Sequence, residues 1–559
     1  MKKLTAIVLC LIMVLGLLSA CGGDGGSNNN DDQGGEGKEV ITIGIPLKTT
    51  VINYDTNAFT LWLEEELDID IQFQKFATGG NDYKTQFAGM LLKGDKMPDI
   101  LWNFESFSGG LWDMYGQEEY LVNLKPYMDD KEGVSKIWWD RVAEIDESYI
   151  ANVLKRCEDD YGDMYVLPRI ETSSIDTMDY MVCINQTWLT ECGLEQPTNI
   201  DEFYNMLVTF KEKMCAGKAG YYPLVGGGPA SLSGDVANWI INMYIYFNDA
   251  TWFNLSEDGT TLTTPFTDPL YREALQFLNK LYEEGLMQYE LDNSEMKNLI
   301  NPADGTPRVG MFVGHPTLNF LSDDVSIDHF TAINNYWGYA VRTEDLNNLS
   351  TGITTDCENP DLAFELLMLA CSEEGSYRLR YGELGEDWDW ADEGAKSYLG
   401  VDCDIKVMSS TLSTSTQNKT WVNGPGILIN AENEAVQYTD EGGWISKRCD
   451  IAAGIYNSFC EAEKNNPKYV CPIMVLSELQ SQTNEAERTN TTNLIYIMRD
   501  TFIKGTSNDT VLGGSNADIN NDDHWNKYLA ALEKEGLQTW QSMMQEIYDN
   551  EYKDIVLAG

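Results

Sequence analysis

Residues 40–46, which read VITIGIP, decide the fold class of this chain. The run is short, apolar and rich in β-branched residues, as is typical of a buried first strand. A helical pattern follows over 59–67, and alternating apolar residues over 69–73 predict a second strand. The same order recurs, with a helix predicted over 84–92 and a strand over 98–102. Strands that alternate with helices indicate an α/β layered sheet.

Similar signals mark elements farther along the chain. Asn199 and Glu202 form a capping-box pattern, which predicts the start of an amphipathic helix. Asp258 and Gly259 predict the turn of a β-hairpin. The other predicted elements are a strand over 309–313 and helices over 271–284, 363–370 and 525–552, the last interrupted near Gly536.

The residues that precede the first strand have the pattern of an export signal. Lys2 and Lys3 stand before an apolar run over 4–18. This run is shorter than the roughly 20 residues that a permanent membrane-spanning helix needs. A positive start, a short apolar segment and small residues at its end predict a secretory signal peptide over 1–20.

The end of this leader predicts a lipid anchor. The sequence LSAC at 18–21 resembles a bacterial lipobox, in which Cys21 becomes the first residue and carries lipid such as palmitate. Residues 22–38 contain no large apolar side chain, so a flexible tether is expected over 21–39. The alternative is an ordinary signal peptide with an incidental cysteine.

Composition limits the classes of partner. The 38 basic and 89 acidic residues give a net charge of −51. A field of this sign repels nucleic acids and anionic lipid headgroups, so neither is expected as a partner and the membrane is contacted through the anchor only. Without leader and tether, about 520 residues remain, enough for two or three globular domains.

The twelve cysteines do not define a metal or redox site. No C-x-x-C pair occurs, which disfavours a zinc ribbon or a thioredoxin-like site. An exported chain can form disulfides, but the scattered spacing leaves their pairing open. Cys371 lies in an apolar helical run and is predicted to be a buried thiol.

Enzymatic signatures were not found. Only three histidines occur, and neither H-E-x-x-H nor G-x-S-x-G is present. Residues 226–228 lack the Lys-Ser/Thr of a phosphate loop, and 518–522 begins like a calcium loop but is not completed. No catalytic residue, cofactor or metal is therefore predicted, although structural calcium stays open. Because glycoside hydrolysis needs only two carboxylates roughly 5–10 Å apart, a surface glycoside hydrolase stays an alternative, as does an adhesin-type lipoprotein.

Several motifs, in chain order, resemble one protein family. They are MPDI at 97–100, LVNLKPY at 121–127, YGDMYVLP at 161–168, NQTWLTECGLEQPTNIDEF at 185–203, the helical segment 271–286 and YGELGEDW at 381–388. Together they resemble extracellular solute-binding protein family 1, the carbohydrate receptors of ABC importers. The length resembles its lipoprotein branch, similar to alginate-oligosaccharide-binding proteins. Thr187 departs from the Asp that the family has before Trp188.

The resemblance implies a fold and a function. The fold is α/β and type II periplasmic-binding-protein-like, with two discontinuous lobes joined by a hinge. Lobe 1 is expected over 40–165 plus 305–355, and lobe 2 over 166–304 plus 356–559. The implied protein is a monomeric receptor, not an enzyme, that binds an oligosaccharide in the interlobe cleft and delivers it to ABC-transporter permease subunits. Lipid at Cys21 would hold it on the extracellular face of a Gram-positive cell membrane.

Candidate binding residues follow from the chemistry of sugars. Aromatic rings suit the C–H faces of a sugar, and carboxylate, amide and guanidinium groups suit its hydroxyls. Loops after strand ends and beside glycines are the best-placed positions. The net charge favours neutral sugars over uronates, and Trp138, Trp139 and Trp525 are assigned to packing. The candidate ligand-binding residues are Trp102, Asn103, Glu105, Arg169, Glu171, Trp239, Trp337, Trp388 and Trp421.

Overall fold

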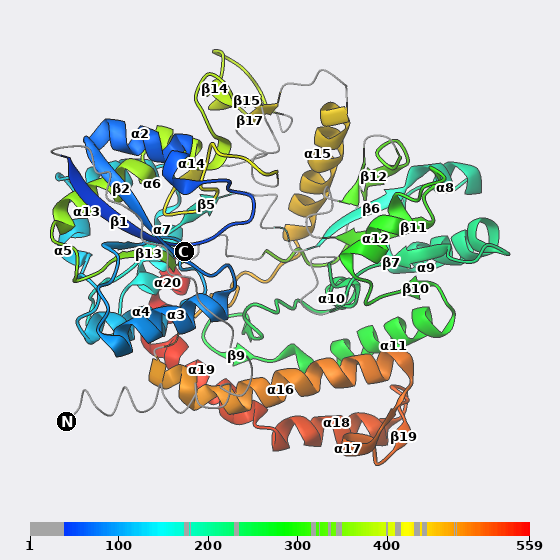
Figure 1. Ribbon diagram of the computed structural model, residues 1–559. Coiled ribbons are helices and arrows are strands. Elements are labelled where there is room, and N and C mark those ends of the chain that lie inside the picture. Colours follow the sequence, from blue (N-terminus) through cyan, green and yellow to red (C-terminus); the bar gives the residue numbers. More distant parts are fainter. Residues whose placement is uncertain are drawn as a thin grey trace, which may run out of the picture.

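Two mixed sheets lie side by side in the computed structural model, each with helices packed around it (Figure 1). Cys21, the predicted leader and most of the tether lie outside the described residues. No helix within the described part of the chain combines the length and the apolar character needed to span a membrane. The structure describes residues 38–172, 178, 180–228, 234–314, 320–322, 325–333, 337–342, 349–397, 401–408, 415–429, 436–438, 444–474, 476 and 478–558.

The first sheet has the strand order β2-β1-β3-β13-β4. β1 runs parallel to β2 and β3, whereas β13 runs antiparallel to β3 and β4. The carboxyl ends of β1, β2, β3 and β4 therefore meet at one edge of the sheet. The strands are β1 (Glu39–Pro46), β2 (Ile69–Phe76), β3 (Ile100–Leu101), β4 (Leu167–Pro168) and β13 (Leu349–Ile353).

Helices pack against this sheet and share one core with it. Ile43, Leu63, Phe87 and Leu367 are fully buried in that core. Cys371 is also fully buried, as predicted, and every cysteine whose side chain is described is a free thiol. The helices are α2 (Ala58–Leu67), α3 (Gly80–Lys93), α4 (Gly109–Gln117), α5 (Lys125–Asp129), α6 (Lys136–Val142), α7 (Glu147–Cys157), α13 (Pro360–Cys371) and α14 (Glu373–Tyr381).

The second sheet has the strand order β10-β7-β11-β6-β12. Its strands are β6 (Met181–Asn185), β7 (Tyr222–Val225), β10 (Met287–Gln288), β11 (Val309–Gly314) and β12 (Phe330–Ala332). The helices beside it are α8 (Gln186–Cys192), α9 (Ile200–Phe210), α10 (Val236–Ile241), α11 (Pro269–Glu283) and α12 (Asn293–Ile300). A π-helix (Lys211–Cys215) continues α9, and a hairpin joins β8 (Asn254–Leu255) to β9 (Leu262–Thr263).

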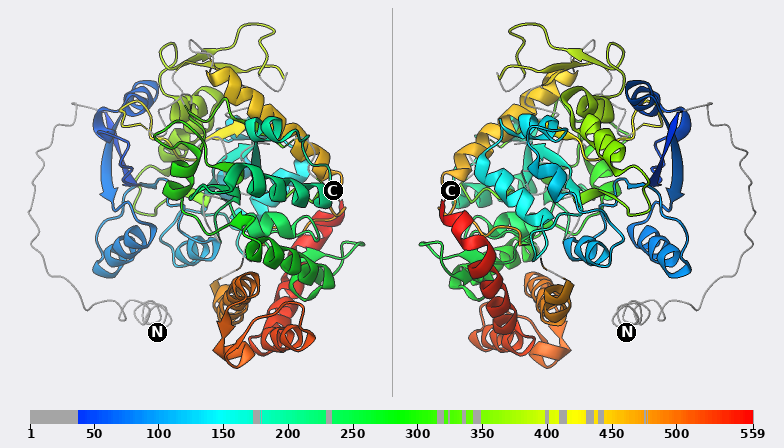
Figure 2. Two further views of the ribbon diagram at one scale, coloured as in Figure 1. Left: turned by 90° about the vertical axis from the view of Figure 1, so that its right-hand side faces the viewer. Right: turned by 90° about the vertical axis from the view of Figure 1, so that its left-hand side faces the viewer.

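The C-terminal part of the chain is mainly helical. In Figure 1, α16 runs beneath both sheets, and Figure 2 shows the following helices gathered at the same end of the molecule. The elements are α15 (Trp444–Glu463), α16 (Glu478–Lys504), β18 (Ser507–Asn508), α17 (Asp509–Leu512), β19 (Ser515–Asn516), α18 (Asp522–Lys534), α19 (Leu537–Ile547), a π-helix (Tyr548–Tyr552) and α20 (Lys553–Ala558).

A buried ion pair fixes α16 against the second sheet's helices. Arg499 and Asp235 are 3% and 6% exposed, and Arg499 Nη1 lies 2.9 Å from Asp235 Oδ2. Arg499 also donates to Asn238 Oδ1. The other oxygen of Asp235 accepts from the backbone N–H groups of Ala237 and Asn238 at the start of α10. One carboxylate thus caps α10 and anchors α16.

Most elements predicted from sequence are confirmed. The strands over 40–46 and 309–313 and the helix over 363–370 are present. Asn199 caps α9 as predicted, but the carboxylate of Glu202 accepts from the backbone N–H of Thr198 instead of closing the box.

The arrangement of the chain differs from the predicted lobe boundaries. Strands β11 and β12, expected in lobe 1, pair with β6 in the second sheet, whereas β13 alone joins the first. Helices α13 and α14, expected in lobe 2, contribute to the core of the first sheet. An apolar run of five residues fits the centre of either sheet, so its hydrogen-bond partner is decided by tertiary packing. We call residues 38–172 and 349–438 the first body, and 178–342 and 444–558 the second body.

Two helical glycines give a matched test of packing in the first body. A Cβ at Gly116 in α4 would lie 2.2–2.4 Å from ring atoms of the buried Tyr165, whereas Gly89 in α3 has nothing within 4 Å. We expect Gly116→Ala to lower the free energy of unfolding by about 1–3 kcal/mol, because the Tyr165 ring must move. Gly89→Ala should raise it by about 0.5–1 kcal/mol. Urea denaturation of both variants measures the difference, and equal effects would contradict it.

The ion pair of α16 also has a control on the same helix. Arg499→Met should lower the free energy of unfolding by about 3–5 kcal/mol, because it leaves the Asp235 carboxylate buried without its cation. Arg488 pairs with Glu485 at 2.9 Å, but their side chains are 45% and 58% exposed. Arg488→Met should therefore cost about 0–1 kcal/mol. Thermal unfolding and urea denaturation test the contrast, which a small effect of Arg499→Met would refute.

Candidate functional site

One segment, residues 415–429, closes over the carboxyl edge of the first sheet, and we call it the strap. Its start bridges Val51 through Gln417, and Asn418 accepts from the backbone of Asn53 at 2.9 Å. Its end forms β16 (Ile427–Ile429), which pairs with β5 (Ile170–Thr172) where the chain leaves the first body. The strap therefore connects the loop after β1 to the exit from the first body.

Lys419 ties the strap to the segment 383–387. Its ammonium lies 2.9 Å from Asp387, 3.2 Å from Glu386 and 3.7 Å from Glu383. Burial acts to lower the pKa of Lys419, but hydrogen bonds to Asp387 and Glu386 outweigh it and raise the pKa above the ordinary lysine value. The attachment is therefore charged throughout the neutral range.

Six of the nine predicted binding residues lie together under or beside the strap. Trp102 Nε1 donates to the carbonyl of Asn423 at 2.9 Å, and Trp421 Nε1 donates to Thr60 Oγ1 at 2.9 Å. The two indole rings meet edge to face with centroids 4.9 Å apart. Residues after the ends of β3 and β4 supply most of this cluster. The six are Trp102, Asn103, Glu105, Arg169, Glu171 and Trp421.

The two indole rings of this cluster are buried beneath the strap. Trp102 is 0% and Trp421 is 1% exposed. A Cβ at Gly424 would lie 2.5 Å from the Trp102 ring, so a glycine allows the strap to approach this closely. In this conformation the rings support the strap, and ligand contact by Trp102 and Trp421 stays a prediction.

Two polar members of the cluster, Glu105 and Arg169, are partly exposed. Arg169 bonds to Glu171, whose side chain is 2% exposed, and lies 3.9 Å from Glu105 Oε1. The Glu105 and Arg169 side chains are 25% and 14% exposed. The amide of Asn423 lies 3.4 Å from Glu105 Oε1 and 3.3 Å from the Lys48 ammonium. Hydrogen-bond acceptors and positively charged donors thus lie within a few ångströms of one another. Such an arrangement is suited to binding the hydroxyl groups of a ligand, which both donate and accept hydrogen bonds.

Lys48 and Asn423 were not predicted as binding residues. Lys48 lies in the loop that follows β1, and Asn423 lies two residues after Trp421. Loops after parallel strands surround the usual ligand position of an open α/β sheet, and this rule would have found Lys48. Asn423 reaches the cluster through the course of the strap, for which the sequence holds no signal.

Two of the six non-glycine residues with a positive φ in the described part of the chain lie in the same place. Asn103 has φ of 61° and Val422 has φ of 73°, the left-handed region that β-branched residues rarely adopt. Asn103 is 5% exposed, and its Oδ1 has no hydrogen-bond partner within the described part of the chain. Strained residues and unsatisfied polar atoms cost free energy and gather at functional sites. The carboxyl end of β3 is therefore the candidate functional site.

The other three predicted residues lie elsewhere. Trp388 is fully buried in a small core beside the sheet formed by β14 (Trp388–Trp390), β15 (Ile405–Val407) and β17 (Val436–Tyr438). Trp239 is buried in the second body, and Trp337, partly buried, packs against the same core with Phe203 5.8 Å away. The structure does not bring these three residues to the cluster at β3.

Comparison with known sequences identifies relatives. Residues 50–376, more than half of the chain, match the family described as bacterial extracellular solute-binding protein. The chain is 22% identical over 451 residues to the fructooligosaccharide ABC transporter substrate-binding protein FusA of Streptococcus pneumoniae, covering 77% of this chain and 74% of FusA. It is 30% identical over 166 residues to Lipoprotein LipO of Bacillus subtilis, a match that covers 29% of each chain.

Solved structures share the fold at low sequence identity. An HMO-binding ABC-transporter-associated solute-binding protein from Bifidobacterium longum infantis has a TM-score of 0.70 at 17% identity, over 92% of this chain and 99% of that one. The alginate-binding protein AlgQ2 has a TM-score of 0.56 at 16% identity, over 92% and 99%.

These likenesses confirm the predicted type II two-lobe α/β fold. The matched family is one of binding proteins and not of enzymes. The chain belongs to the bacterial extracellular solute-binding protein family.

Proposed function

We propose that this protein is a lipid-anchored extracellular receptor that binds an oligosaccharide between its two bodies and delivers it to an ABC-importer permease. The observation that carries the proposal is the cluster of Glu105, Arg169 and Asn423, partly exposed above two buried indoles. It lies beside β5, from which the chain crosses to the second body. FusA, by its name, serves fructooligosaccharide transport, and LipO is a lipoprotein.

The chemistry of the cluster fits a neutral sugar. Within the described part of the chain, the polar contacts of the Glu105 side chain are long, at 3.4 Å to Asn423 and 3.9 Å to Arg169, so its carboxylate can accept from sugar hydroxyls. Arg169, held by Glu171, presents a charged donor with its position fixed. Bonds of this kind are roughly twice as strong as neutral ones. Relative motion of the two bodies would then enclose the sugar and shift the population of a closed state.

Calorimetric titration with oligosaccharides, together with recovery of the sugar, distinguishes a receptor from a glycoside hydrolase. Isothermal titration of the purified protein against neutral oligosaccharides, fructooligosaccharides included, should show saturable binding to at least one, with a raised unfolding temperature. The sugar should be recovered intact, and a uronate oligosaccharide should bind more weakly. Release of reducing ends would instead indicate a glycoside hydrolase. Binding to no sugar, with binding to another protein, would contradict the carbohydrate assignment.

The carboxylate of Glu105 offers a local test. Glu105→Gln removes a charged acceptor and should weaken sugar binding about 10- to 100-fold, since hydrogen bonds to charged groups contribute about 1.5–3 kcal/mol. The matched control is Glu358→Gln, at a side chain that is 92% exposed, which should leave the Kd unchanged. Unfolding temperatures of both variants check that they are folded. An unchanged Kd in Glu105→Gln would remove this cluster as the binding site.

A further inference from the structure

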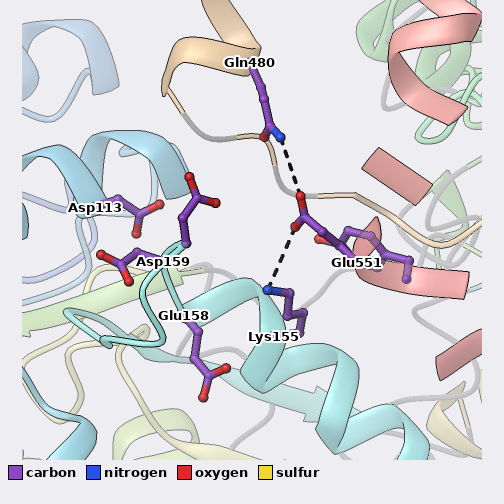
Figure 3. Close-up of a pocket in the computed structure, with 8 residues that line it drawn as sticks. Asp113, Lys155, Glu158, Asp159, Gln480 and Glu551 are labelled. Atoms are coloured by element: carbon purple, nitrogen blue, oxygen red, sulfur yellow. Dashed lines mark hydrogen bonds and ion pairs between the residues drawn. The ribbon is translucent and has the colours of Figure 1, made fainter. Parts of the chain in front are cut away.

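The C-terminal helices touch the first body at a small acidic pocket that shares no residue with the cluster. The pocket lies between α4, α7, the π-helix 548–552 and the start of α16 (Figure 3). The lining residues are Asp113, Lys155, Glu158, Asp159, Asp160, Gln480, Glu551 and Tyr552. Because α16 and the π-helix belong to the core of the second body, this contact joins the two bodies independently of the segments that cross between the sheets.

Glu551 makes polar contacts on both sides of the pocket. Glu551 Oε2 lies 3.9 Å from Lys155 Nζ, and Gln480 Nε2 lies 3.5 Å from Glu551 Oε1. In Figure 3, Lys155 points toward Glu551, whereas Glu158 points away from it. Glu158 pairs with Lys125 outside the pocket, at 3.4 Å. Lys155 is the single cation among the lining residues. Because Lys155 pairs with Glu551, its charge is divided between Glu551 and the other carboxylates of the pocket.

The Asp159 carboxylate is held in place beside Asp113. One of its oxygens accepts from the backbone N–H groups of Tyr161 at 2.8 Å and Asp163 at 3.0 Å. The other accepts from Gln117 Nε2 at 3.0 Å. These three hydrogen bonds fix the position of the Asp159 carboxylate. Figure 3 shows the Asp113 and Asp159 carboxyl groups next to one another.

Asp113 has no such support. Within the described part of the chain it makes no hydrogen bond or ion pair, and it is only partly exposed. Burial, followed by the charges of Asp159 and Asp160, raises the pKa of Asp113 to about 7, against a smaller opposing effect of Lys155. Glu158, Glu551 and the hydroxyls of Tyr552 and Tyr165 are the other titratable groups around it.

We propose that the Asp113 pocket is a proton-sensitive latch, which holds the C-terminal helices of the second body on the first body while Asp113 is neutral. Ionised Asp113 would stand beside the fixed Asp159 anion in a partly desolvated contact. Opening the contact lets water solvate the new charge. Acid thus tightens the junction of the two bodies, and base loosens it.

The direction of the effect follows from linkage. With the contact open, water solvates the Asp113 carboxyl group and its pKa falls toward the ordinary value of about 3.9, while Asp159 and Asp160 stay beside it. Between this open-state pKa and about 7, opening releases one proton, so the opening equilibrium rises by up to tenfold per pH unit. Above this range Asp113 is ionised in both states, and the rise stops. The stabilisation is therefore complete below the pKa of Asp113 in the open state and is lost as pH rises to about 7.

Hydrogen exchange of the purified protein tests the latch. Protection factors of α20 and of the first turns of α16 should fall about tenfold between pH 5 and 6, and less than about twofold between pH 7.5 and 8.5. Asp113→Asn keeps the shape of the neutral acid and should abolish this pH dependence. Asp95→Asn, at an exposed carboxyl group on another loop, should leave it unchanged.

A second, milder substitution keeps the proposal testable if Asp113→Asn does not fold. Asp160→Asn removes one neighbouring charge, so the pH at which protection levels off should move down, with the total change reduced. The proposal is overturned if Asp113→Asn, or, should that variant not fold, Asp160→Asn, has the pH profile of the unsubstituted protein. Sugar is not used in these measurements, so their outcome does not depend on the proposed receptor function.

Discussion

The buried pair of Arg499 and Asp235 is the interaction on which the arrangement of the second body depends. Asp235 caps α10, and Arg499 lies near the end of the 27-residue α16. A guanidinium is poorly tolerated in an apolar core unless its charge is compensated, so the two helices have one register in which both can be buried. That register places the start of α16 against α4 of the first body. The contact between the bodies is thus set by a pair deep inside one of them.

The sequence specified the local elements well, and the assembly less well. The β1–α2–β2 unit could be predicted because period-2 and helical patterns act over a few residues. The partition of the chain could not, because β11 is a short apolar run that would fit either sheet, and β13, which reads LSTGI, carries little strand signal of its own. Which sheet accepts a strand depends on neighbours that lie far away in sequence.

The same limit applies to the candidate site. Positions after strand ends led to Trp102, Glu105 and Arg169, which the fold brings together. Residue type alone could not distinguish a ring that faces a ligand from one that supports a loop, and Trp388 lies in a separate core. The close approach of the strap, which depends on Gly424, explains why Trp102 and Trp421 are buried. The strap covers the two indole rings, so polar side chains such as Glu105 and Arg169 form the exposed surface there.

The position of β13 has a consequence for biogenesis. This strand fills the gap between β3 and β4, although the whole second sheet is encoded between β4 and β13. During synthesis, the first sheet therefore stays split until residues near 350 emerge, with the edges of β3 and β4 that later pair with β13 still open. Unpaired edges invite aggregation, and non-local pairing is slow. A chain built in this way is a natural client for folding factors, and the core of its second body is also completed late, because α16 to α19 follow β13 in the chain.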